Sequence, residues 1–227
     1  MVERRWVADS ARIERLALAS GVVFVVLAVV AFEVATGPDG GASNDEILAY
    51  FSDNATAVKW QALVFGLAGA FFLWFGGTLA SVIRRAEGDP AGRLPAVVVA
   101  ATAASTAIFF VGMASWLTLA ETGESVALYG LGESAFGLTD FTAAAFVLAA
   151  SLGVLRTRLV QDWLGWLGML LTVLLLVDGV VQALGDSGAV QTLNQIAFFA
   201  FLVWVFIASS LLAWQREARL QPGRAAV

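Results

Sequence analysis

The chain has no cysteine and no histidine among its 227 residues. Without cysteine it forms no disulfide, iron–sulfur cluster or thiolate zinc site, and it has no cysteine nucleophile. Without histidine it lacks the usual haem ligand, the commonest transition-metal ligand and the commonest general base. No cofactor or metal is therefore expected. Any chemistry must use carboxylates, amides, hydroxyls, arginines or the single lysine, Lys59.

Charge is scarce as well. Charged residues make up 14% of the chain, hydrophobic residues make up 59%, and the mean hydropathy is +0.82. This composition is typical of membrane proteins, so the lipid bilayer is the expected partner. The net charge of -5 argues against a nucleic-acid partner, because phosphate binding needs a clustered cationic surface. Oligomeric state and protein partners stay open.

Six apolar runs are long enough to cross the roughly 30 Å hydrocarbon core of a bilayer. They cover residues 16–35, 61–82, 96–119, 135–155, 163–183 and 192–213. The sequence therefore predicts an all-α integral membrane six-helix bundle over 16–213, after a basic segment at 1–15 and before a tail at 214–227. None of these runs contains proline, so a proline-broken transporter helix is not expected.

Arginine predicts the orientation of the bundle. With six spans, all twelve arginines fall on one side, and the positive-inside rule makes that side cytoplasmic. Both termini are then expected in the cytoplasm, with the chain in the plasma membrane. Seven acids share the arginine side, which leaves it at +5, whereas Lys59 and eleven acids bring the outer side to -10.

Only the first outer loop is long enough to hold structure of its own. Ser43 followed by Glu46 matches a capping box, and Ile47 and Phe51 fall on one helical face. These residues predict a short amphipathic helix near 44–52 on the outer surface. Two roles are open for it: a lid over an outer cavity, or a loop that covers the top of the bundle.

The inner ends of the even-numbered spans look alike. They read GGTLASVIRR, AASLGVLRTR and ASSLLAWQRE, each with small residues followed by arginine. Three tandem helical hairpins would produce this likeness. So would a common need for small packing residues and an anchoring arginine at each helix end, and the two explanations stand side by side.

Polar residues in or beside the spans are the candidate ligand-binding residues. Asp178 lies roughly 8 Å inside the outer end of span five, and Gln182 is one turn further out on the same face. Asp140 lies at a similar depth in span four, on a face that also carries Glu133. The other candidates border the outer ends of spans one, two and six: Glu33, Lys59, Gln61, Asn194 and Gln195.

These groups lie almost entirely in the outer half, which predicts an acidic, polar pocket open to the outside. An ionised aspartate in hydrocarbon costs at least about 2.5–3.5 kcal/mol, so such residues normally face water or a bundle interior. If Asp140 and Asp178 face each other, they would share a proton or hold a cation. The expected function is binding or passage of a small molecule, lipid or cation.

Two other classes of protein stay open. A membrane-embedded enzyme would protonate a lipid or prenyl substrate from Asp140 or Asp178. In an accessory subunit without a ligand, the same residues would only hold the helices together.

Three motifs carry a resemblance to a known group. They are ILAYFSDN before span two, FFLWFGGTL within it and RRAEGDPAGRL after it. Over roughly its first half the chain resembles uncharacterised multi-pass membrane proteins of actinobacteria, and its second half is similar only in hydropathy. The resemblance implies a multi-pass membrane topology and no activity.

Overall fold

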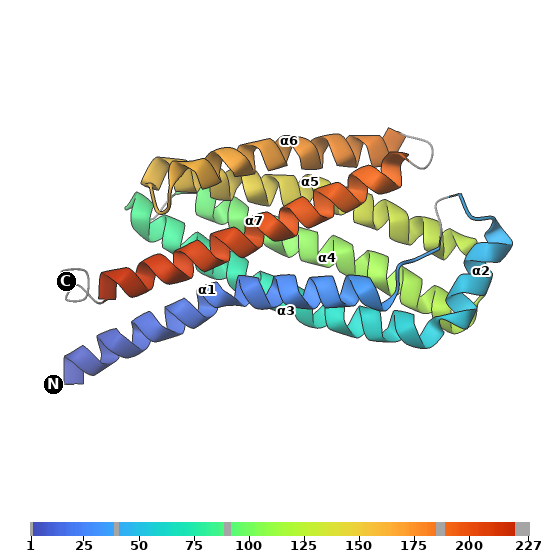
Figure 1. Cartoon of the computed structure of the whole chain (residues 1–227), viewed down its shortest axis with the longest axis horizontal. Helices are drawn as coiled ribbons and strands as arrows, with labels where there is room; N and C mark the ends of the chain where they lie inside the picture. The colour runs from blue at the N-terminus through green and yellow to red at the C-terminus, as the bar shows by residue number, and fades with distance from the viewer. Residues whose placement is uncertain (1, 39–40, 89–91, 185–188, 221–227) are drawn as a thin grey trace.

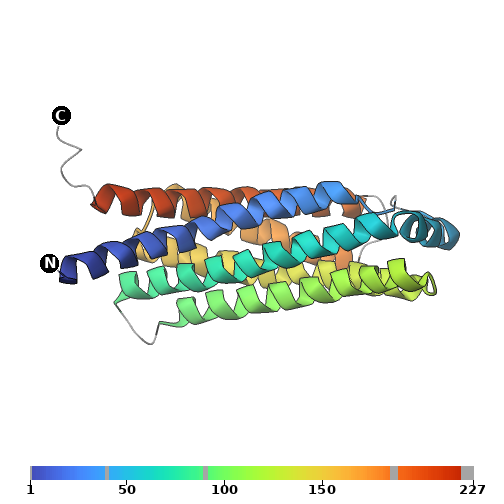
Figure 2. The same ribbon diagram turned by 90° about the horizontal axis from the view of Figure 1, so that it is seen from below.

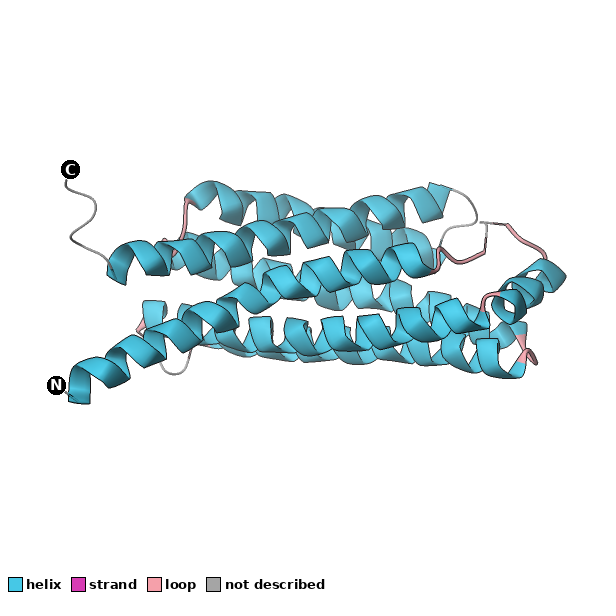
Figure 3. Cartoon of the chain, turned by 60° about the horizontal axis from the view of Figure 1, so that its bottom comes forward, coloured by secondary structure: helices cyan, strands magenta, loops and turns pink. Residues whose placement is uncertain are grey.

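The computed structural model describes residues 2–38, 41–88, 92–184 and 189–220, with side chains for 16–38, 41–88, 92–184 and 192–214. This part of the chain holds seven α-helices and no strand (Figures 1 and 3). The helices are α1 (Val2–Val34), α2 (Asn44–Asp53), α3 (Ala55–Glu87), α4 (Arg93–Thr122), α5 (Val126–Thr157), α6 (Asp162–Leu184) and α7 (Ala189–Leu220). The predicted all-α bundle is confirmed.

Six of these helices, all except α2, contain a stretch long and apolar enough to cross a membrane. Several of these helices extend beyond their apolar stretch, because a helix ends at a terminating residue and not where its hydrophobic residues end. Gly88 ends α3 and Gly123 ends α4, both in the left-handed conformation that glycine adopts without strain. Pro95 is in the first turn of α4, where its missing N–H removes no helical hydrogen bond.

The six long helices form a ring. Each packs against the next along the chain, α1 packs against α7, and α3 also contacts α5. Both termini lie at one end of the bundle, called here the terminal end, and α2 lies across the other, the α2 end (Figures 1 and 2). An even number of spans has this consequence whichever way the bundle faces.

The helix expected near 44–52 is α2, and it begins at a capping box. The Ser43 Oγ accepts a hydrogen bond from the Glu46 amide, and Glu46 Oε2 accepts one from the Ser43 amide at 2.7 Å. The Ser43 Oγ also donates to Glu46 Oε2 at 2.8 Å. The hydrogen bonds that the Ser43 amide and then the Ser43 hydroxyl donate to the Glu46 carboxylate lower the pKa of this carboxyl group. Ile47 and Phe51 are buried together with Val58 at the start of α3.

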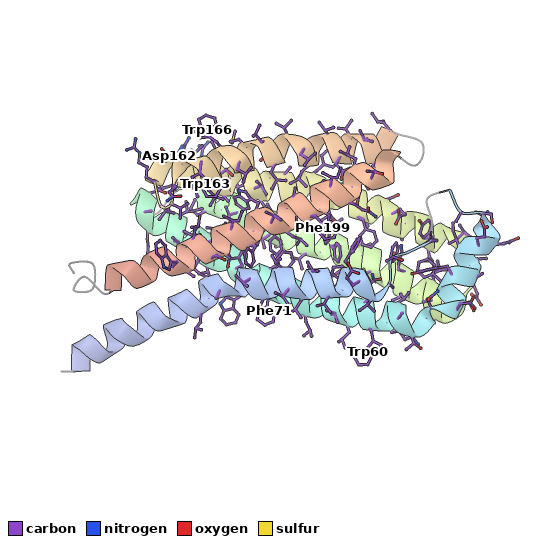
Figure 4. All side chains as sticks on the ribbon, viewed as in Figure 1. Trp60, Phe71, Asp162, Trp163, Trp166 and Phe199 are labelled. Atoms are coloured by element: carbon purple, nitrogen blue, oxygen red, sulfur yellow. The ribbon has the colours of Figure 1, made fainter. Side chains whose placement is uncertain are left out.

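The outer surface of the bundle is apolar, as expected for helices that face lipid. Leu170 is 71% exposed, and many other leucines and valines on the spans are exposed as well. Trp163 and Trp166 lie on the surface near the terminal end, and Trp60 lies on the surface toward the α2 end (Figure 4). Exposed tryptophans at both ends match the aromatic belts of membrane proteins.

The terminal half of the bundle is closely packed. Phe75, Phe146 and Trp204 are almost completely buried there, and Trp204 Nε1 donates a hydrogen bond to the Leu164 carbonyl at 3.2 Å. Ser209 Oγ donates to the Leu18 carbonyl, which ties α7 to α1. Close packing in the terminal half fixes the positions of the six long helices relative to one another.

Candidate functional site

Toward the α2 end the ring encloses a cavity of about 440 Å³. All six spans contribute to its lining, as does the loop between α1 and α2. Most lining residues come from the part of each span nearer the α2 end, for example 24–32 of α1 and 61–69 of α3, and a few, such as Phe72 and Ala143, lie near the middle of their helices. The cavity therefore lies mainly in one half of the bundle.

Eleven of the 31 lining residues are aromatic. The rings are Trp116, Tyr129 and nine phenylalanines: Phe24, Phe32, Phe65, Phe72, Phe109, Phe110, Phe136, Phe198 and Phe201. Sequence reasoning missed this wall, because phenylalanine is common throughout the spans and periodicity alone does not say which apolar face turns inward. The only local signal is the glycines that lie close to these rings, such as Gly112 beside Phe136.

Asp140, Asp178 and Gln182 form one hydrogen-bonded group, called here the acid–amide cluster. Gln182 Nε2 donates to Asp140 Oδ2 at 2.8 Å and to Asp178 Oδ2 at 3.1 Å. Asp178 is completely buried, whereas Asp140 and Gln182 line the cavity. Gly137 makes room for the contact, since a Cβ there would lie 2.9 Å from Gln182 Oε1. The structure thus brings together Asp140 and Asp178, which the sequence placed at a similar depth, and Gln182, which it placed one turn further out on the face of Asp178.

One face of α5 runs along the cavity. Tyr129, Glu133, Phe136, Asp140 and Ala143 all line it, at the alternating spacing of four and three that keeps residues on one helical face. Two of these five side chains are carboxylic acids. Among the described residues that line the cavity there is no lysine or arginine.

The amide of Gln61 faces the cavity from α3. Its side chain is only 3% exposed, and its Nε2 donates to the carbonyl oxygens of Ala31, at 3.2 Å, and Ala35 near the end of α1. Its Oε1 accepts no hydrogen bond from the described residues. Two further candidates, Asn194 and Gln195, line the cavity from α7.

Glu33 and Lys59 lie outside the cavity. Both are exposed, and Lys59 Nζ is 3.5 Å from Glu121 Oε1 at the end of α4. Lys59 and Gln61 are two residues apart, which is about 200° around a helix, so they point in nearly opposite directions. The residue that turns inward is the uncharged one.

Hydroxyl groups and acids complete the chemistry of the site. Ser105, Thr106 and Thr139 line the cavity, and Ser105 Oγ donates to Thr142 Oγ1 at 2.8 Å. Within the described part of the chain, no three acidic side chains gather as they would to hold a metal ion. The arrangement offers hydrogen-bond acceptors and carboxyl groups beside a large aromatic surface.

Comparison of the chain with protein-family models, with curated proteins and with solved structures found no match. The function is therefore inferred from the geometry and chemistry of the site.

Proposed function

We propose that this multi-pass membrane protein binds a small amphipathic molecule or lipid in the cavity, for uptake, release or passage across the bilayer. The observation that carries the proposal is the combination of eleven aromatic rings with a set of polar side chains around one space. These side chains, called here the polar wall, are Gln61, Glu133, Asp140, Gln182, Asn194 and Gln195. Ligand sites in proteins are typically concave and mostly apolar, with a few polar groups that fix the orientation of the ligand. The rings would hold the apolar part, and the polar wall would hold the head group.

The acid–amide cluster is well suited to fix such a head group. Asp178 is completely buried and accepts a hydrogen bond from Gln182, which also holds Asp140 at the cavity wall. Asp140 is therefore oriented by a second layer of contacts before any ligand arrives. Binding then costs little ordering of this side chain, which favours affinity.

The proposed orientation places the cavity in the outer half of the membrane and both termini in the cytoplasm. Arg84 and Arg85 near the end of α3, and Arg156 and Arg158 near the end of α5, support it, because all four lie toward the terminal end. The chain has no cysteine, so a single introduced cysteine reports its own position. In intact cells, Ser52→Cys should react with a membrane-impermeant maleimide and Gln161→Cys should not; the reverse pattern overturns the orientation.

Native mass spectrometry of protein extracted gently from its membrane tests the binding function. Ala143 lines the cavity and is 5% exposed, so Ala143→Phe should fill part of the space. Leu138 lies on the same helix but is 54% exposed on the outer surface, which makes Leu138→Phe the matched control. A defined mass retained by the wild type and by Leu138→Phe, and lost from Ala143→Phe, is the expected result.

Asp140→Asn extends the test to the polar wall. It should fold normally and retain less of the same molecule, because it removes the ionisable group that faces the cavity. If wild type and all three variants retain the same mass equally, or if all four are bare and equally stable, the cavity is not a ligand site. The polar residues would then serve helix packing alone.

The acid–amide cluster also favours a second candidate, acid–base catalysis on a lipid or prenyl substrate. Two carboxyl groups joined through one amide, with one of them facing the cavity, can hold and release a proton at a defined place. An enzyme would convert the retained molecule to a new mass in the wild type. Asp140→Asn would retain the molecule without converting it.

A further inference from the structure

The charge of the cavity lining has one sign. Glu133 and Asp140 both line it, and no lysine or arginine does so among the described residues. The one lysine of the chain lies on the surface, 3.5 Å from Glu121. Glu133 is exposed and Asp140 is half-buried, and among the described lining residues no cationic side chain lies beside either acid. A carboxylate that ionises beside apolar walls favours a countercharge.

Three aromatic rings surround the same part of the wall and are called here the aromatic cage: Trp116, Tyr129 and Phe136. Trp116 stacks on Tyr129 with ring centroids 6.0 Å apart and meets Phe136 edge to face at 5.1 Å. Glu133 lies about one helical turn from both Tyr129 and Phe136 on α5. Aromatic faces attract cations, and cages of such rings are used to recognise ammonium groups.

Close packing sets the positions of the cage. A Cβ at Gly132 would lie 2.4 Å from Trp116 Cδ1, and one at Gly112 would lie 2.4 Å from Phe136 Cε1, so glycine is needed for both rings to sit where they do. From outside the cavity, Phe51 of α2 packs edge to face on Trp116 with centroids 5.4 Å apart. The cage is held by three helices.

A separate observation points to a ligand with a hydrogen-bond donor. Gln61 lines the cavity and is 3% exposed, yet its Oε1 accepts no hydrogen bond from the described residues. A buried amide oxygen without a donor is costly, so a bound molecule or a water is expected to supply one. Gln61 belongs to α3 and is independent of the acids on α5.

We infer that the ligand of this cavity is an organic cation, an ammonium compound with an apolar body, held by Glu133, Asp140 and the aromatic cage. The inference rests on the proposed binding function and names its ligand class. An inorganic cation fits less well. Calcium and magnesium take six or more oxygen ligands, whereas no three acids gather in the described residues and eleven of the lining residues are aromatic.

Two probes of the same shape test the charge requirement. Phenyltrimethylammonium and tert-butylbenzene differ only in the central atom, which is a positive nitrogen in one and a neutral carbon in the other. Binding is measured by saturation-transfer NMR on the protein in nanodiscs, with empty nanodiscs to subtract partition into lipid. Phenyltrimethylammonium should bind about tenfold or more tightly than tert-butylbenzene, as expected for a desolvated cation on aromatic faces.

Three variants test whether the preference for the cationic probe depends on Glu133 and Asp140. Glu133→Gln and Asp140→Asn keep the shape of each side chain and should bring the two probes to within about threefold of each other. Glu124→Gln, at an exposed acid that does not line the cavity, should leave the wild-type preference unchanged. The comparison on the wild type alone needs no variant, so a variant that fails to fold does not remove the test.

The outcomes separate the two proposals. If both probes bind the wild type and Ala143→Phe weakens both, but the neutral probe binds equally well or better, the cavity is a ligand site and the cation inference is wrong. If the wild type binds neither probe above the empty nanodisc, both the inference and the proposed binding function are contradicted. A preference for the cation that survives in both Glu133→Gln and Asp140→Asn overturns the assignment to these acids.

Discussion

The two halves of the bundle are built from the same six helices and differ in how they are filled. In the terminal half, at its border with the cavity, Phe146 is completely buried and packs on the rings of Phe72, Phe75 and Trp204, with centroids 5.2, 6.4 and 6.2 Å apart. In the other half, phenylalanines such as Phe198 line a cavity of about 440 Å³. The comparison teaches that close helix packing and open space are separated along one axis.

The separation has a physical reason. In a bilayer the lipid tails are as apolar as the side chains, so helices associate through close packing and interhelical hydrogen bonds. The terminal half supplies both, with Gly168 closely approached by Ser151 and with hydrogen bonds from Trp204 and Ser209 to neighbouring helices. Because the terminal half holds the helices together, the half nearer the α2 end can contain a cavity.

The largest expected effect comes from removing a ring from each half. Phe146→Ala should lower the free energy of unfolding by about 3 kcal/mol or more, because it opens a void in close-packed surroundings. Phe198→Ala should cost only about 1 kcal/mol, because this ring already faces open space and has fewer contacts to lose. Equilibrium unfolding of the two variants in detergent provides the measurement.

Equal losses for Phe146→Ala and Phe198→Ala would mean that the α2 half is packed as tightly as the terminal half. If Phe146→Ala does not fold at all, Phe146→Leu serves in its place, with a smaller loss that should still exceed that of Phe198→Leu.

A pair of adjacent glycines gives a smaller effect. At Gly76 a Cβ would lie 2.3 Å from Thr102 Oγ1 and 2.9 Å from its Cβ, so Gly76→Ala should push α3 away from α4 and cost about 1–3 kcal/mol. At Gly77 no atom lies within 4 Å of the added Cβ, so Gly77→Ala should leave stability unchanged or slightly higher. Thermal melting of both variants tests this, and a similar loss at the two positions would contradict the close approach of α3 to α4.

The smallest effect concerns α2 and depends on pH. The hydrogen bonds from Ser43 lower the pKa of Glu46 below its ordinary value of 4.5. A lowered carboxyl pKa stabilises the helix above that ordinary value, and the contribution is lost as the pH falls through the lowered pKa. The protection factors of the amides in residues 44–53, which correct the exchange rates for the intrinsic effect of pH, should therefore fall on acidification and change little between about pH 5 and 8.

Two variants isolate this step. Glu46→Gln should remove the acid-dependent loss of amide protection in α2, and Ser43→Ala should weaken α2 at neutral pH by about 1 kcal/mol through loss of the cap. Exchange in the packed half, for example around Phe146, should be the same in both variants as in the wild type. An unchanged acid response in Glu46→Gln would show that other groups control the stability of α2.

Part of the candidate site follows from the sequence, and Asp140, Asp178 and Gln182 show why. Two acids in consecutive antiparallel spans were expected at one depth, and the spacing of four residues puts Gln182 on the same face as Asp178. Lys59 and Glu33 show the limit. Their positions along the chain also suggested the pocket, but the rotation of α1 and α3 turns both outward.

What the sequence by itself determined is the class of the protein: an all-α chain with six apolar spans, a capped short helix after the first, and polar residues in or beside the spans that lie almost entirely in one half. Length, apolar content, capping residues and charge are local properties, so they can be read without a fold. Only the tertiary structure decided which faces turn inward, that aromatic rings line a cavity, and that Gln182 joins two carboxyl groups. Those features depend on how six helices rotate against one another, and contacts between residues far apart in the chain set that rotation.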